Sequence, residues 1–236
     1  MCSTKVDVYK EFKNSSRLPY NKKAFVAEQF LFYKTLIGNK LRFTNSQSYE
    51  FILGRNFLGN TLFDLNKSLI FLRRALKFVQ QVRQNEGVIL FVGTRDDLQK
   101  VVESIGVQTK SPYVNYRWLK GLLTNWENTS NSIKFYNLFL KKLAMRNKQK
   151  NKMANTFFGI RNMKKLPDAI FILDLSTDYE VLREANALNI PVIALVDSNI
   201  PSRKIDYPIP ANSDSILSII FFANLIISSL KNIVKN

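Results

Sequence analysis

The stretch LPDAIFILDLSTDYEVLREANALNIPVIALVDSN, residues 166–199, decides the fold class. It holds two short apolar runs, 169–173 and 192–196, and a segment with helical spacing at 179–188 between them. Uninterrupted apolar runs of this length are typical of strands that are buried on both faces of a parallel sheet. Two such strands joined by a helix form a right-handed crossover unit. The stretch therefore predicts an α/β fold.

The same alternation continues toward the N-terminus. The run GVILFVGT, residues 87–94, predicts another buried strand. A helix is expected over the RDDLQKVVESIG that follows, with Gly106 as its C-cap. Apolar residues spaced by three and four predict a further helix over 66–84, with Asn66 as its N-cap.

Polar and basic segments surround this alternation. A short helix is expected at 24–36 and a loop at 38–47, and the Lys-, Arg- and Asn-rich segment 127–165 predicts a helical hairpin that projects from the domain. The predicted organisation is a basic N-terminal arm (1–23), a first part of the α/β domain (24–126), the hairpin insertion (127–165) and a second part of the α/β domain (166–236).

The C-terminal segment completes the sheet. Residues 200–212 are expected to be extended, and their prolines exclude a central strand. Ser213 is the expected cap of a final helix. The apolar run 215–230 is shorter than the roughly 20 residues that a membrane span needs, so it predicts a buried helix.

The charge of the chain points to a polyanionic partner. The sequence has 35 Lys+Arg against 18 Asp+Glu, a formal net charge of +17. A compact domain with this charge repels itself unless a polyanion neutralises it. Nucleic acid is the first candidate and an anionic membrane surface the second, and a merely soluble basic protein stays open as a third.

Residue types and motifs narrow the possible chemistry. There is no histidine, and Cys2 is the single cysteine, which excludes Ser-His-Asp and Cys-His catalysis, a disulfide within the chain and a cysteine-based zinc site. The turn VGTRDD has one glycine, and Asp96 and Asp97 would repel a phosphate there. No cofactor is therefore expected.

Two acids remain as candidates for a site. Asp174 and Asp197 follow neighbouring predicted strands, at the edge where α/β folds bind ligands. They could hold a divalent metal in an enzyme, or they could accept hydrogen bonds that shape turns. The lack of a supporting His, Cys or glycine loop favours the structural interpretation.

The basic residues recur in the predicted loops rather than along one helix, which favours contacts with RNA phosphates. Trp118, within RWLKG, could stack on a base or belong to the core. RNA contacts are predicted for Lys40, Arg42, Arg117, Trp118, Lys120, Asn125, Lys164, Lys165, Arg203 and Lys204.

Four segments together resemble the bacterial-type ribosomal protein S2 family. They are ILFVGT, PYVNYRWLKGLLTN, the stretch 166–199 and IDYPIPANSDSILSI, in the order and spacing of that family, and the likeness covers most of residues 50–231. It includes Asp174 and Glu184 in register. Because the resemblance is specific, the chain is identified as a member of this family.

The resemblance implies a Rossmann-like (flavodoxin-like) α/β domain, a parallel sheet between two helix layers, with a protruding helical hairpin. It implies a non-enzymatic ribonucleoprotein component that supports translation. Such a protein would contact rRNA and neighbouring ribosomal proteins between the head and the body of the small subunit. It would have no membrane partner and would not form a homo-oligomer. The loop 117–125 corresponds to the tryptophan-containing loop of the family.

The sequence departs from the family in three places. The HFGH element of the family aligns with LIGN, residues 36–39, so both histidines are missing. The predicted hairpin is shorter, and the basic arm is longer. Together with a composition rich in Lys, Asn, Ile and Phe and with 8 glycines, this divergence predicts a mitochondrial version, ahead of a plastid or bacterial one.

Overall fold

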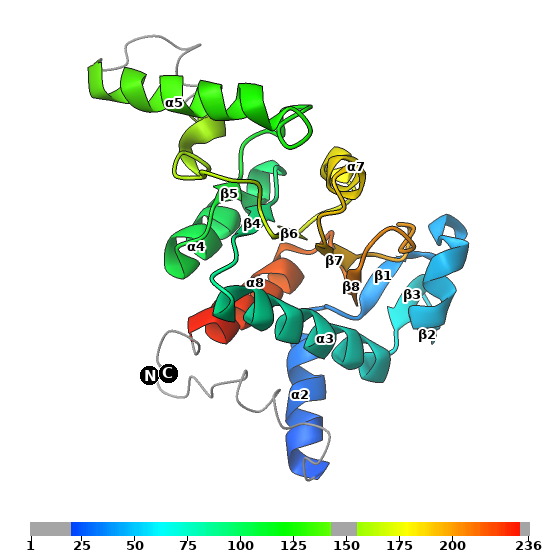
Figure 1. The fold of residues 1–236 in the computed structure, drawn as a ribbon. Coiled ribbons are helices and arrows are strands. Elements are labelled where there is room, and N and C mark those ends of the chain that lie inside the picture. The colour runs from blue at the N-terminus through cyan, green and yellow to red at the C-terminus, as the bar shows by residue number, and fades with distance from the viewer. Residues whose placement is uncertain (1–19, 143–154, 232–236) are drawn as a thin grey trace.

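Five short apolar segments pair side by side as one parallel sheet (Figure 1). A computed structural model describes residues 20–142 and 155–231 of the chain. The strands lie in the order β5-β4-β6-β7-β8, which in chain order is 2-1-3-4-5. This is the flavodoxin-like order of a doubly wound α/β fold, so the predicted fold class is confirmed. The strands are β4 (Ile89–Val92), β5 (Tyr113–Val114), β6 (Ala169–Ile172), β7 (Val192–Val196) and β8 (Tyr207–Pro210).

Alternate side chains of each strand enter two separate cores. In β4, Ile89 and Phe91 join one core, and Leu90 and Val92 join the other. The first core is covered by the helices α3 (Leu65–Gln84), α4 (Gln99–Thr109) and α8 (Ile216–Lys231). The second is covered by α7 (Tyr179–Ala187), by α5 (Trp126–Lys142) and by the segments that precede and follow α5. The sheet therefore lies between two helix layers.

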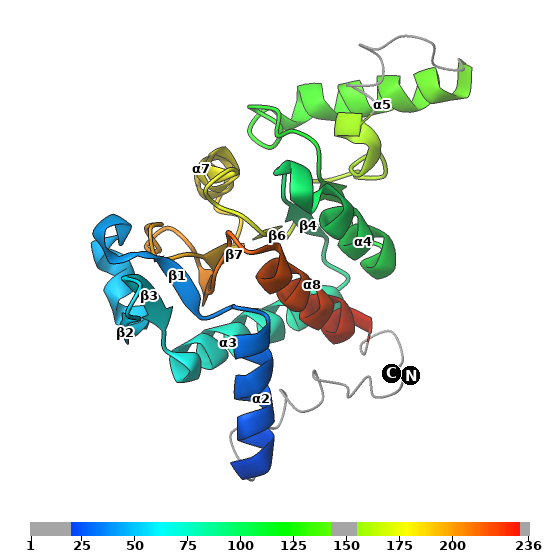
Figure 2. The same cartoon turned by 180° about the vertical axis from the view of Figure 1, so that it is seen from behind.

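Figure 2 shows the molecule from the side opposite to Figure 1, with helix α8 beside the parallel sheet. Most residues of α8 are buried, in agreement with the prediction from the run 215–230. Within the part of the chain that the structure describes, no helix is long and apolar enough to cross a membrane.

A small antiparallel sheet lies beside the parallel one. It has the order β1-β3-β2, with strands at Ile37–Lys40, Asn60–Phe63 and Ile52–Arg55. The prediction of a loop at 38–47 was wrong for residues 38–40, which belong to β1, where Lys40 pairs with Asn60 of β3. Sequence periodicity missed this four-residue strand, which has only one fully buried position.

Three predicted helix caps were wrong by a few residues. The side chain of Asp64, not Asn66, caps α3, and it accepts a hydrogen bond from the Asn66 N–H at 2.9 Å. Helix α4 runs past Gly106 to Thr109 and ends at Lys110, which has a φ of 53°. Before α8, Asn212 rather than Ser213 accepts from the backbone N–H groups that follow.

The two predicted polar extensions are described in part. Helix α2 (Tyr20–Phe32) begins before residue 24, so the last residues of the predicted arm are helical, and residues 1–19 lie outside the described residues. Of the residues predicted to form the hairpin, the structure describes helix α5 and a short helical turn at 155–158. The tip of the predicted hairpin, 143–154, also lies outside the described residues. Figure 1 shows α5 projecting from the sheet.

Both edges of the parallel sheet are blocked. At one edge, the β5 residue Tyr113 donates its N–H to the carbonyl of Gly159. At the other edge, Ala211 N–H points inward to Val196 O at 3.1 Å. Because backbone groups alternate along a strand, Pro208 and Pro210 of β8 face outward, where neither offers an N–H. This agrees with the prediction that the Pro-rich segment is not a central strand.

Candidate RNA-binding surface

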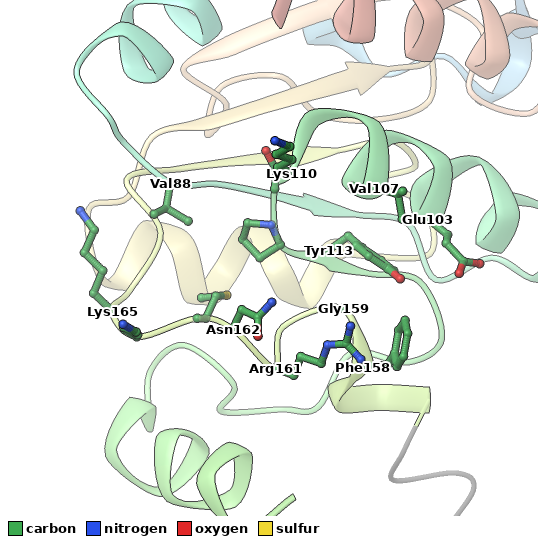
Figure 3. Close-up of a pocket in the computed structure, with 15 residues that line it drawn as sticks. Val88, Glu103, Val107, Lys110, Tyr113, Phe158, Gly159, Arg161, Asn162 and Lys165 are labelled. Atoms are coloured by element: carbon green, nitrogen blue, oxygen red, sulfur yellow. The ribbon is translucent and has the colours of Figure 1, made fainter. Parts of the chain in front are cut away.

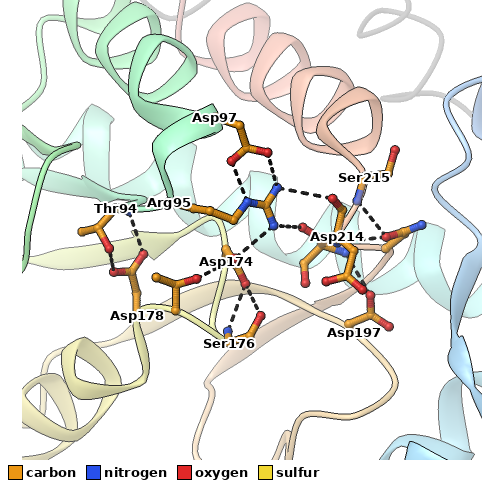
Figure 4. Close-up of polar contacts among 12 residues, drawn as sticks. Thr94, Arg95, Asp97, Asp174, Ser176, Asp178, Asp197, Asp214 and Ser215 are labelled. Carbon is orange, nitrogen blue, oxygen red and sulfur yellow. Dashed lines mark hydrogen bonds and ion pairs between the residues drawn. The ribbon is translucent and has the colours of Figure 1, made fainter.

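Asp174 is saturated with hydrogen bonds at the carboxyl edge of β6 (Figure 4). Its carboxylate is 1% exposed and accepts from Arg95 Nη1 at 3.1 Å, from the Ser176 N–H at 3.0 Å and from two hydroxyls. Arg95 also donates to the carbonyl of Ser213 at 2.9 Å. Asp174 and Arg95 therefore join the ends of β4, β6 and β8.

Asp178 and Asp197 close the rest of this edge. Asp178 accepts from the N–H and the hydroxyl of Thr94 at 3.0 and 2.7 Å, and Asp197 accepts from the N–H groups of Ser198 and Ser213 at 2.6 and 3.1 Å. Burial raises the pKa of each of these two carboxyls to about 6. Hydrogen bonds to the charged form oppose that shift.

Within the described residues, these acids are not grouped as a metal centre would need. Each accepts from neighbouring donors of the chain itself, and the described residues contain no group of three or more His, Cys, Asp or Glu that could hold a metal ion. The geometry supports the structural interpretation of Asp174 and Asp197: they tie the strand ends together.

A buried carboxylate on α7 shapes the loop that follows β5. The carboxylate of Glu184 accepts from Trp118 Nε1 at 3.0 Å and from the N–H groups of Gly121 at 2.7 Å and Leu123 at 2.9 Å, with a longer bond from Thr124. One side chain thus satisfies four donors of the loop 118–124. Carboxylates hold such donors more strongly than neutral acceptors do, so the loop has a fixed shape.

This loop presents cations on either side of a core residue. Trp118 is 9% exposed and packs in the second core, so its ring has no free face for a base, and the structure favours the core interpretation. Arg117 and Lys120 are exposed beside it, and Asn125 is exposed at the end of the loop. Gly121 has a φ of 85°, which permits the sharp turn.

A second group of predicted RNA contacts gathers at the end of β7. Two loops meet here, because Asn45 N–H donates to Ser198 O at 2.8 Å and Arg203 N–H donates to Gln47 Oε1 at 3.2 Å. The exposed cations carried by these loops are Lys40, Arg42, Arg203 and Lys204. The structure therefore places residues that are far apart in the sequence on neighbouring loops.

The last two predicted contacts lie elsewhere. Lys164 and Lys165 precede β6, at the amino edge of the sheet, opposite the loops described above. Lys165 forms an ion pair with Asp168 at 2.9 Å. The pKa of Asp168 is lowered, first by the hydrogen bond from the Val88 N–H and then by Lys165. The predicted RNA contacts thus fall at two opposite edges.

Sequence reasoning gave no role to several residues of these sites. Glu184 was noted only as a position shared with the family, and a single glutamate on a helix carries no signal of its four loop partners. Lys110 and Arg161 border a cavity at the amino edge. They come from segments more than 50 residues apart, which no local pattern joins.

Comparison with known proteins gives one consistent result. The family model described as "Ribosomal protein S2" matches residues 31–232. The small ribosomal subunit protein uS2 of Anaplasma marginale is 37% identical over 213 residues, which cover 85% of this chain and 65% of that protein. The proteins of the same name from Anaplasma phagocytophilum and Pseudoalteromonas translucida are 36% and 33% identical; the matches cover 85% and 82% of this chain and 72% and 85% of theirs. All three are bacterial proteins.

Proposed function

Because the chain belongs to the ribosomal protein S2 family of the small ribosomal subunit, we propose that it binds rRNA through exposed cations on loops at the carboxyl edge of its sheet. It is a structural ribosomal protein and not an enzyme. The buried acids at the strand ends agree with that role, because donors of the chain itself already hold their carboxylates.

The shape of the loop after β5 carries this proposal. Arg117 and Lys120 are exposed on a loop whose backbone is held by Glu184. A loop that is already ordered loses little conformational freedom on binding, which favours affinity. Cations on it would bind phosphates and so position the protein on the RNA.

The loops at the end of β7 add a different kind of contact. The guanidinium of Arg42 lies over the ring of Phe43, 4.6 Å from its centroid, and Phe43 is 58% exposed. Exposed aromatic rings and guanidinium planes are surfaces on which unpaired bases of RNA stack. This pair, together with Arg203 and Lys204, forms the second RNA contact that we propose.

A separate apolar surface fits a protein neighbour. Strand β2 exposes Leu53 at 74%, and the turn that follows it exposes Phe57 at 97% and Leu58 at 67%. Adjacent exposed apolar side chains of this size mark protein interaction sites. We assign them to a neighbouring small-subunit protein rather than to a second copy of this chain. The position between head and body, which the family resemblance implies, belongs to the same proposal.

A mitochondrial ribosome is the location that we propose. The support is compositional: the chain is rich in Lys, Asn, Ile and Phe, has 8 glycines, and has no histidine where the family has two. Subcellular fractionation with immunodetection of the native protein tests this location. Recovery with plastid ribosomes or with ribosomes of a bacterial cell would contradict it.

Co-sedimentation tests the function itself. The tagged full chain, expressed in its own cells, should travel with small subunits through a sucrose gradient in low and moderate salt. It should also bind small-subunit rRNA more tightly than a shuffled RNA of equal length. A chain that stays at the top of the gradient, or that sediments with membranes, would contradict the proposal.

A further inference from the structure

A cavity of about 820 Å³ opens at the amino edge of the parallel sheet (Figure 3). Its walls come from the end of α4, the start of β5 and the segment 158–165. Sites for small ligands have volumes of about 300–1,000 Å³ and combine mostly apolar walls with a few polar groups. This cavity fits that description, since it is lined by aromatic and aliphatic side chains and rimmed by cations.

Tyr113 is held rigidly in the wall of this cavity. A methyl group at Gly106 would lie 2.1 Å from the Tyr113 ring, and one at Gly159 would lie 2.1 Å from the Tyr113 carbonyl oxygen and 2.7 Å from its ring. Both glycines therefore let the chain approach the tyrosine closely from two sides. This close contact, rather than a role as a helix cap, explains why position 106 is a glycine.

The hydroxyl of Tyr113 has no hydrogen-bond partner. The residue is 6% exposed, and its Oη is a buried polar atom that nothing in the described chain satisfies. Burial first, and then Glu103, raises the pKa of this hydroxyl, so it keeps its proton at neutral pH. An unpaired buried hydroxyl costs free energy, and a bound ligand with an acceptor atom would remove that cost.

The rim of the cavity has an excess of positive charge. Arg161 lies over the ring of Phe158, with its guanidinium carbon 4.3 Å from the centroid, and Phe158 is 43% exposed. Lys110 and Lys164 are exposed and form no ion pair within the described residues, whereas Lys165 is paired with Asp168. Glu103 is the one acid of the lining.

We propose that this cavity binds one unpaired nucleotide of RNA. The base would stack on the surface formed by Phe158 and Arg161, its edge or ribose would accept from the Tyr113 hydroxyl, and its phosphate would lie near Lys110 and Lys164. A flat ring joined to a phosphate matches an aromatic wall beside cations. An acidic peptide matches only the charge. The inference rests on the proposed RNA-binding function and assigns a site to it.

Binding of a small-subunit rRNA fragment to the full chain tests the site. Phe158→Ala should weaken binding about 5- to 100-fold with little change in salt dependence, as expected for the loss of one stacked base. Tyr113→Phe should weaken it about 5-fold without lowering the melting temperature, because the variant removes only an unsatisfied hydroxyl. Chemical probing should show one unpaired nucleotide protected by the wild-type chain and not by Phe158→Ala.

Charge variants and their control complete the test. The double variant Lys110→Gln and Lys164→Gln should make the salt dependence shallower by about 1.5. The control Lys77→Gln with Lys100→Gln removes the same charge from exposed positions on α3 and α4, away from this rim. It should have a smaller effect.

Three outcomes would overturn the inference. Pocket variants that bind rRNA like the wild type, while the wild type still prefers rRNA to shuffled RNA, would remove the site and leave the proposed function. Phe158→Ala that binds rRNA normally but fails to enter small subunits would assign the cavity to a protein segment. Micromolar binding of free AMP that Tyr113→Phe abolishes, with unchanged rRNA affinity, would assign it to a free nucleotide.

Discussion

The two edges of the parallel sheet are built in opposite ways. At the carboxyl edge, buried acids in the loops that follow β6 and β7 accept hydrogen bonds from Arg95, Thr94 and Ser213, so the strand ends are closed. At the amino edge, a cavity is left open, a buried hydroxyl lacks a partner and two lysines are unpaired within the described residues.

This arrangement is the reverse of the one that is usual for the fold. Doubly wound α/β proteins bind their ligands in a crevice at the carboxyl edge. Here the acids that would line such a crevice hold the chain together, and the exposed cations lie on the outside of the loops. A strand-end aspartate in this fold therefore indicates an active site only where its hydrogen-bond capacity is not already used by the chain.

The largest effect is expected from replacing Glu184, the carboxylate that holds the loop after β5 at the carboxyl edge of the sheet. Glu184→Ala leaves Trp118 Nε1 and backbone donors of the loop 121–124 without their acceptor, and each buried donor without a partner costs about 1–3 kcal/mol. We expect the free energy of unfolding to fall by about 3–5 kcal/mol, measured by urea denaturation.

The matched control for this variant is on the same helix. Glu180 forms a surface ion pair with Arg183 at 3.1 Å, and such pairs contribute about 0–1 kcal/mol. Glu180→Ala should therefore stay close to the wild type. If Glu184→Ala melted like Glu180→Ala, the loop would be held by something other than this carboxylate.

The pH dependence of stability gives a second test of the buried acids at the carboxyl edge. The pKa of Asp197 is raised from 3.8 to about 6 in the folded protein, mainly by burial. The folded state therefore binds a proton that the unfolded chain releases between these values. The free energy of unfolding should fall as the pH rises from about 4 to about 6, by on the order of 2–3 kcal/mol from this group, and the loss is complete above that range.

Asp197→Asn removes this titration. Urea denaturation at pH 4, 5, 6 and 7 gives the unfolding free energy of both proteins. Relative to the variant, the wild type should lose unfolding free energy as the pH rises through that range. The exposed variant Asp96→Asn serves as control and should keep the wild-type profile. A constant difference between wild type and Asp197→Asn would contradict the raised pKa.

Removing cations from the carboxyl-edge loops should change binding and not folding. Replacing Arg117, Lys120, Arg203 and Lys204 by Gln removes four exposed charges. The log–log salt dependence of rRNA binding should become shallower by about 3, since each phosphate contact contributes about 0.7–0.9. A matched variant with Arg74, Lys77, Lys100 and Arg183 replaced, all exposed on helices, should change the slope less. Equal slopes in the two variants would mean that these loops are not the RNA surface.

The smallest effect concerns the tryptophan of the anchored loop. Trp118→Phe keeps an aromatic ring in the core and removes the hydrogen bond to Glu184. The cost to stability should be about 1 kcal/mol, with rRNA affinity unchanged. The opposite pattern, with stability kept and affinity lower by about 1–3 kcal/mol, is what a base stacked on Trp118 would give. A melting curve beside an rRNA titration separates the two.

The sheet could be predicted from the sequence because buried parallel strands leave uninterrupted apolar runs. Strand β7 lies at the predicted residues, and β4 and β6 lie within their predicted runs. Helix caps were less accurate, since Asp64 and Asn66, like Asn212 and Ser213, are all suitable capping residues. The choice between them depends on the angle at which the chain enters the helix.

The candidate sites were predictable only in part. Exposed cations leave a compositional signal, so the exposure of Arg117 and Arg203 could be predicted, while their contact with RNA stays a prediction. The four donors that meet Glu184, and the two glycines that flank Tyr113, belong to segments that only the folded chain brings together. Contacts between such distant segments leave no periodic pattern in the sequence.

The blocked edges of the parallel sheet bear on how the protein behaves before it joins a ribosome. A free sheet edge is a template on which another chain can add a strand, the first step of aggregation. Pro208 and Pro210 give an incoming strand no donors along β8, and the carbonyl of Gly159 already occupies the Tyr113 N–H of β5. A newly made copy of the chain is thus protected against joining other copies edge to edge along this sheet.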